Sequence, residues 1–252
     1  MQLTRERKER LLLANVLVVA VCALIYELLC GTLASYLLGD AVLQFSLVLG
    51  TYLFAMGVGA WVSKALEPRA ERRYVQAELL LALVGGLSVP GLLFGVSLHV
   101  PLRPALYAIV FVVGALVGVE LPLLVKMLRA PVHTDQHASS SNIDLSIDNR
   151  STIDSSTSTQ PSFGGTVARA LAYDYAGALA ASVLFPLVLV PRLGLVRTAV
   201  AAGALNAVVA ISATWVVKTD RPALLRTAGA AVLAFLAVAF VRGEAWVAAA
   251  TD

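Results

Sequence analysis

Apolar residues gather in long segments separated by short polar stretches, and this alternation predicts the elements of the chain. About seven such segments can be read, covering residues 11–38, 44–64, 77–98, 104–128, 167–191, 196–217 and 223–241. A helix of about 20 apolar residues crosses the hydrocarbon core of a bilayer. The pattern therefore predicts an all-α, polytopic membrane helix bundle with about seven transmembrane helices.

A polar, Ser-rich stretch interrupts this pattern at residues 130–165. It has too little apolar surface to offset the entropy lost on ordering, so we expect a disordered cytoplasmic loop there. The loop divides the chain into a first membrane helix group of four helices, 1–129, and a second group of three, 166–252. The seventh segment is Ala-rich, and it decides on which side of the membrane the C-terminus lies.

Composition supports a membrane protein, because 59% of the residues are hydrophobic and only 14% are charged. A soluble domain of this length needs a more polar surface, so the lipid bilayer is the first expected partner. The net charge of +3 is too small to suggest nucleic acid. Basic residues are densest before the first segment and after the second, fourth and sixth, which places the N-terminus in the cytoplasm.

Three acids lie within apolar segments and are the candidate intramembrane binding or proton-relay residues: Glu27, Glu120 and Asp174. Two of them follow a tyrosine, and we add Tyr26 and Tyr173 to the candidates. A charge at membrane depth costs about 2.5–3.5 kcal/mol, so it needs a partner, a proton or a function. The alternative is structural: Glu120 and Asp174 then pair with basic residues nearby in sequence, Lys126, Arg129 and Arg169.

Small residues on the same helix faces predict close helix packing. We expect helix contacts at Gly31, Gly57, Gly59, Gly114, Gly118 and Gly177. Residues four and seven positions after Glu27 and Asp174 are glycine or alanine, so both acids should point into the bundle.

No catalytic residue is predicted. The sequence has no Gly-x-Ser-x-Gly motif, and no Gly-rich nucleotide loop follows a strand pattern. Its histidines, His99, His133 and His137, fall in loops, and neither a metal nor a cofactor is expected. Cys22 and Cys30 are about 12 Å apart on one helix, too far for a disulfide.

Several separated motifs resemble one known family. They are Tyr26-Glu27 with Gly31 and Gly39-Asp40, Val119-Glu120-Leu-Pro122, Asp174-Tyr-x-Gly177, Phe185-Pro186, and Leu193-Gly194-Leu. Together they are similar to the N-terminal membrane region of bacterial membrane-bound spermidine synthase-like proteins. The resemblance implies the bacterial inner (plasma) membrane as location. It also implies a soluble aminopropyltransferase domain that uses decarboxylated S-adenosylmethionine; nothing in these residues matches that domain, so the chain looks like the membrane region without it.

We therefore expect an integral membrane module that anchors a soluble aminopropyltransferase domain or partner, or supplies polyamine to it. An alternative is a proton-coupled transporter of small cations or polyamines, and a second alternative is a structural membrane scaffold. Whether this chain is itself an enzyme stays open. The partners considered are a soluble aminopropyltransferase domain or subunit, a polyamine ligand and a second copy of the chain.

Overall fold

The computed structural model describes residues 5–129, 163–217 and 219–251. In these ranges every regular element is a helix, which confirms the all-α fold for the described part of the chain. The predicted loop at 130–165 lies almost wholly outside the described residues. The helices are α1 (Arg5–Leu38), α2 (Ala41–Leu66), η1 (Glu67–Arg69), α3 (Ala70–Gly86), α4 (Ser88–Ser97), α5 (Leu102–Arg129), α6 (Phe163–Leu184), η3 (Phe185–Leu189), α7 (Val190–Val216) and α8 (Pro222–Thr251).

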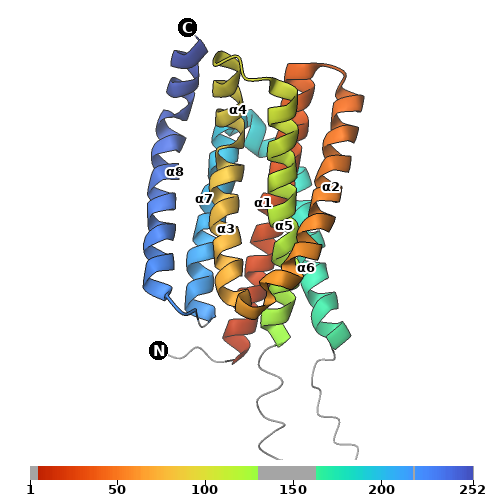
Figure 1. Cartoon of the computed structure of the whole chain (residues 1–252), viewed down its shortest axis with the longest axis vertical. Coiled ribbons are helices and arrows are strands. Elements are labelled where there is room, and N and C mark those ends of the chain that lie inside the picture. Colours follow the sequence, from red (N-terminus) through yellow and green to blue (C-terminus); the bar gives the residue numbers. More distant parts are fainter. Residues whose placement is uncertain (1–4, 130–162, 218, 252) are drawn as a thin grey trace, which may run out of the picture.

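The helices form one bundle in which successive long helices run in opposite directions (Figure 1). Helix α1 is central, because it packs against α2, α5, α6 and α7. The most extensive contact joins α2 to α5, while α3 packs between α5 and α7, and α8 covers α7 at the edge. The start of α1, η1, the end of α5, the start of α6 and the α7–α8 connection all lie at one end of the bundle (Figure 1).

The predicted segment 77–98 is two helices rather than one. Helix α3 begins already at Ala70, because its first turns carry the polar residues that an apolar count leaves out, and it ends at Gly86. The break at Leu87 has a local cause: Pro90 has no N–H with which to continue the backbone ladder. The Ser88 hydroxyl donates instead to the Gly85 carbonyl at 2.6 Å, and α4 begins there.

The boundary predicted between 167–191 and 196–217 is also more complex. Helix α6 leads into the short π-helix η3, whose first turn contains Pro186. The chain reverses at Gly194, which has a left-handed φ of 72° that favours glycine. The Thr198 hydroxyl then donates to the Gly194 carbonyl at 2.6 Å and tightens the restarted helix. A hydropathy pattern shows the reversal but not the π-helix that precedes it.

Length and composition give five candidate membrane spans in the described residues. Three are single stretches: Arg7–Leu38, Leu102–Met127 and Pro222–Gly243. The other two, Ala41–Gly86 and Val167–Val216, are 46 and 50 residues long, and each includes a reversal of direction (Figure 1).

Glycines allow the backbones of α2 and α5 to touch. A Cβ on Gly59 would meet the Ala115 carbonyl, and a Cβ on Gly114 would lie 2.8 Å from the Tyr52 carbonyl oxygen. A Cβ on Gly118 would lie 2.7 Å from the Cα of Met56. Such approach of backbones through small residues is typical of membrane helix pairs. It brings α5, and with it Glu120, against the centre of the bundle.

The other expected packing glycines have different surroundings. Gly31 lies under the Phe45 ring, and Gly177 faces the Leu17 carbonyl of α1. Gly57 takes no part in such a contact, because no heavy atom lies within 4 Å of the place its Cβ would occupy. It shares α2 with Gly59 but lies on another face of that helix.

This difference predicts opposite effects for two Gly→Ala substitutions. Gly118→Ala places a methyl group against the Met56 backbone and should destabilise the protein by about 1–3 kcal/mol. Gly57→Ala meets no atom and should be neutral or slightly stabilising, because alanine favours helix. Thermal unfolding in detergent measures both variants, and equal shifts would show that the α2–α5 contact is looser than described.

Candidate functional site

The structure places the three predicted acids at different depths. Glu120 of α5 is buried, with 3% of its surface exposed, whereas Glu27 of α1 and Asp174 of α6 are only partly buried. Asp174 interacts electrostatically with Glu120, so α5 and α6 bring two of the three into one neighbourhood. The third, Glu27, lies close to Cys30 and Tyr52.

A fourth acid, Glu78 of α3, completes the site and was missed by sequence reasoning. Its side chain is fully buried and interacts electrostatically with Glu120. Glu78 is the second residue of the predicted segment 77–98, a position that suggests a charge at the membrane boundary. The signal was nevertheless present: Ala82 and Gly85 follow at four and seven positions, the same small-residue stripe that marks Glu27 and Asp174.

Tyrosines surround the acids from three helices. The fully buried Tyr26 ring lies against Gly85, where a Cβ would come within 2.5 Å of it. Tyr74 precedes Glu78 by one turn of α3 and lies close enough to interact with it electrostatically. Tyr52 of α2 donates its hydroxyl to the Ala23 carbonyl at 3.1 Å. Tyr52 is also within electrostatic reach of Glu27, Glu120 and Asp174. It therefore lies between Glu27 and the neighbourhood that contains the other two acids.

Tyr173 lies away from this cluster. It is 40% exposed on α6, and its side chain faces outward. Helical geometry accounts for the difference, because Tyr173 precedes Asp174 by one residue and adjacent helical residues point about 100° apart.

Two of the basic residues expected to pair with the interior acids pair with other acids instead. Lys126 pairs with Glu67 at 3.1 Å, and Arg169 pairs with Glu9 at 2.8 Å. Both pairs are partly exposed at the end of the bundle where these helices meet (Figure 1). The ion pairs expected for Glu120 and Asp174 are therefore replaced by pairs with acids at the helix ends. The side chain of Arg129 lies outside the described residues.

Helix α7 brings neutral polar groups to the interior. The Ser212 hydroxyl donates to the Asn15 carbonyl oxygen of α1 at 3.1 Å, and the Cys22 thiol lies 3.5 Å from the Ala202 carbonyl oxygen. Asn206 is fully buried one turn beyond Ala202. Cys22 and Cys30 are both free thiols.

Within the described ranges, His, Cys, Asp and Glu side chains form no group of three that could hold a metal ion. His133 and His137 lie outside these ranges. The candidate site consists of two buried carboxyl groups, two partly buried carboxyl groups, three tyrosines and an asparagine. Carboxyl, phenol and amide groups can bind protons or cations, and carboxyl groups do so most strongly at membrane depth.

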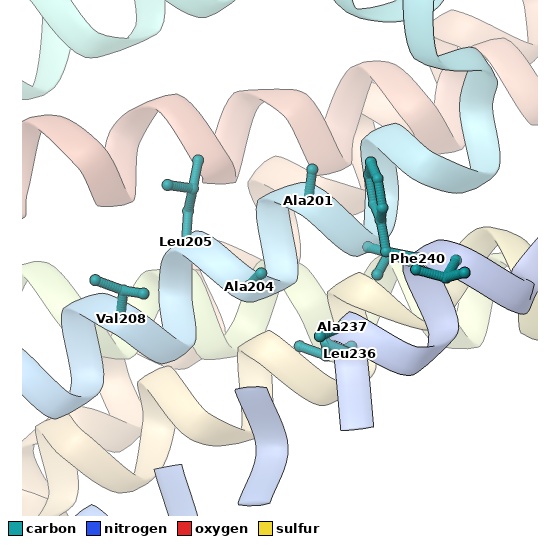
Figure 2. A pocket seen from close by; sticks show the side chains of 9 residues that line it. Ala201, Ala204, Leu205, Val208, Leu236, Ala237 and Phe240 are labelled. Carbon is teal, nitrogen blue, oxygen red and sulfur yellow. The ribbon is translucent and has the colours of Figure 1, made fainter. Parts of the chain in front are cut away.

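A separate surface groove runs between α7 and α8. It is lined by apolar side chains only: Val200, Ala201, Ala204, Leu205, Val208, Leu236, Ala237, Phe240 and Val241 (Figure 2). With no polar group in its lining, the groove offers hydrocarbon contact but no chemistry.

Comparison with known proteins gives similarity to enzymes. The chain is 43% identical over 226 residues to polyamine aminopropyltransferase 2 of Ralstonia nicotianae, which covers 89% of this chain and 39% of that relative. It is 38% identical over 228 residues to polyamine aminopropyltransferase of Leptospira interrogans, covering 90% of this chain and 40% of the relative. Polyamine aminopropyltransferase 1 of Streptomyces coelicolor is 37% identical over 201 residues, 80% of this chain and 33% of the relative. No family model and no solved structure matches the chain.

These relatives correct the function expected from the sequence. Proteins that cover most of this chain are named as aminopropyltransferases, which points to an enzyme rather than to a membrane anchor, a transporter or a scaffold. The expectation failed because it combined the family resemblance with the lack of a catalytic motif in these residues and concluded from this a role beside the reaction. The chain spans about two fifths of the length of the curated relatives it matches.

The Tyr52 contact yields a stability prediction. Tyr52→Phe removes the hydrogen bond to the Ala23 carbonyl and should lower the free energy of unfolding by about 0.5–1.5 kcal/mol. Tyr36→Phe is the matched control, because Tyr36 is 79% exposed. Chemical unfolding in detergent compares the two variants, and an equal loss in both would mean that the buried hydroxyl contributes nothing specific.

Proposed function

We propose that these residues belong to a polyamine aminopropyltransferase and form a membrane-embedded helical region of that enzyme. One observation carries the proposal: relatives from three bacteria, each named as such a transferase, align with 80–90% of the chain at 37–43% identity. The activity is proposed for the protein to which these residues belong. The relatives' name indicates a polyamine as the acceptor of the aminopropyl group.

The exposed apolar surface supports a position in the membrane. Helix α2, of 26 residues, is about 39 Å long, enough to cross the hydrocarbon core. Its outward residues are large and hydrophobic, among them Val42, Leu49, Leu53, Phe54 and Trp61. Soluble proteins rarely expose an apolar surface this continuous, whereas lipid tails would cover it.

Seven crossings fit the arrangement of the helices. Three candidate spans are single, and each of the two double-length spans reverses direction once (Figure 1). Basic residues support the bacterial inner membrane with a cytoplasmic N-terminus, because many of them gather at the end where α1 starts. They are Arg7, Lys8, Arg10, Lys64, Arg69, Arg72, Arg73, Lys126, Arg169 and Arg221.

The enzyme proposal predicts product formation by the protein expressed from its natural gene in a bacterial host. Membranes that contain it, supplied with decarboxylated S-adenosylmethionine and putrescine, should form a polyamine longer by one aminopropyl group. Mass spectrometry detects the product, and membranes from cells carrying the empty vector are the control. Equal product in both preparations, with the protein present by immunoblot, would reject the proposed activity.

The topology predicts which turns a membrane-impermeant maleimide can reach. In a background without Cys22 and Cys30, a cysteine replacing His99 after α4 should react in intact spheroplasts. A cysteine replacing Glu67 in η1 should react only after permeabilisation, since η1 lies at the same end as the start of α1, the end proposed to be cytoplasmic. The reverse pattern would invert the proposed orientation, and reaction of both in intact spheroplasts would contradict a crossing by α3.

A further inference from the structure

Two carboxyl groups are buried close to each other inside the bundle, and neither takes part in an ion pair in the described residues. Glu78 of α3 is 0% exposed and Glu120 of α5 is 3% exposed, and the two helices pack together. No hydrogen bond of standard geometry reaches either oxygen of either carboxyl group in the described part of the chain, although the Tyr74 hydroxyl lies close enough to Glu78 to interact with it. Buried polar groups are nearly always hydrogen-bonded, so four unsatisfied oxygens in one place require an explanation.

Other unsatisfied polar groups lie near the two acids. The Tyr26 and Tyr74 hydroxyls and both side-chain polar atoms of Asn206 are buried and make no hydrogen bond. Tyr26 interacts electrostatically with both acids. These groups come from α1, α3 and α7, so the site is built by four helices once α5 is included.

Packing register places Asn206 beside Glu78. Helices α3 and α7 run antiparallel, and a Cβ on Gly203 would lie 2.6 Å from the Ala82 carbonyl oxygen and 2.8 Å from the Cα of Gly86. One turn back from Ala82 is Glu78, and about one turn on from Gly203 is Asn206. Both residues are fully buried, so the amide of Asn206 lies in the same layer as the Glu78 carboxyl group.

Among the described residues, neither of the two acids forms an ion pair with a basic side chain. Lys126 and Arg169 pair with Glu67 and Glu9, and Arg226 of α8 lies 3.9 Å from the centre of the Trp215 ring and donates to Thr214. The titratable groups that face the pair are themselves neutral or acidic: Cys22 and Tyr26 from α1, Tyr52 from α2, Tyr74 from α3 and Asp174 from α6. Helix α4 has no titratable residue, and α7 adds the neutral Asn206 at this level.

We propose that Glu78 and Glu120 form a proton-binding site in the interior of the bundle, occupied by at least one proton when the helices are packed. A bound proton removes one of two like charges that would otherwise stand close together away from water. It also turns one carboxyl group into a donor, while the tyrosine hydroxyls and the Asn206 amide can donate to the remaining oxygens.

Asp174 of α6 is partly exposed and interacts electrostatically with Glu120, so the buried pair has an acid with access to the surface within its electrostatic reach. A proton is also small enough for the packing, since glycine contacts hold α3 close to α7 and α5 close to α2. The proposal does not depend on the aminopropyl transfer.

Proton release on unfolding tests the site directly. The purified protein is unfolded with sodium dodecyl sulfate in weakly buffered detergent at pH 7, and an indicator dye records the protons released. Glutamate in water ionises at about pH 4.3, so each carboxyl group that holds a proton in the bundle releases it. The double variant Glu78→Gln/Glu120→Gln should release about one proton fewer than the wild type, or up to two.

Control variants separate this site from the other acids. Glu67→Gln, at the exposed pair with Lys126, should release as many protons as the wild type. If the double variant does not fold, the single variants Glu78→Gln and Glu120→Gln decide, and at least one of them should show the loss. A loss confined to Glu27→Gln or Asp174→Asn would overturn the proposal.

A comparison of different salts tests the competing ligand, a metal cation. Melting temperatures are measured in sodium, potassium, magnesium and calcium chloride at constant ionic strength. A proton site predicts the same melting temperature in each salt. A rise with one cation that Glu78→Gln abolishes, together with unchanged proton release, would replace the proton by that cation.

Discussion

The packing of two carboxyl groups into a buried helix interface constrains the rest of the bundle. Glu78 and Glu120 can be buried only if α3 and α5 exclude lipid around them, and Tyr26 of α1, Tyr74 of α3 and Asn206 of α7 place further polar groups near them. The close approach depends on glycines, at Gly85 beneath the Tyr26 ring and at Gly203 beside Ala82. Because the helices touch through their backbones, there is little freedom to move an unsatisfied oxygen away from its neighbours. The packing of these helices and the protonation of Glu78 and Glu120 therefore depend on each other.

Much of the fold could be predicted from hydropathy, and the exceptions have identifiable causes. Helices α1, α2 and α5 begin and end near the predicted residues, because long apolar runs leave few alternatives. The division of 77–98 at Leu87 depends on Pro90 and the Ser88–Gly85 hydrogen bond, which are local backbone effects that a hydropathy average cannot detect. Glu27, Glu120 and Asp174 were recognisable as isolated charges. Glu78 was not, because its neighbours Glu71, Arg72 and Arg73 make the start of α3 look like an ordinary polar helix end.

The reaction could not be read from these residues. Buried acids on small-residue stripes suit transport, ligand binding or helix assembly equally well, since all three need a charge kept from lipid. The relatives' names point to an enzyme instead, while the structure shows where the polar interior of the helical region lies. The basic residues matter for a different reason: Lys126 and Arg169 have partners at the helix ends, which leaves the interior acids dependent on one another.

Infrared spectroscopy of the carboxyl groups tests the central claim, that the buried pair carries a proton while the helices are packed. A protonated carboxylic acid absorbs at the carbonyl stretch, and a carboxylate absorbs at its separate antisymmetric stretch. At neutral pH the folded protein should show carbonyl absorption of a protonated acid that weakens in Glu78→Gln or Glu120→Gln. Carboxylate absorption lost in both variants, with the carbonyl band unchanged, would contradict the claim.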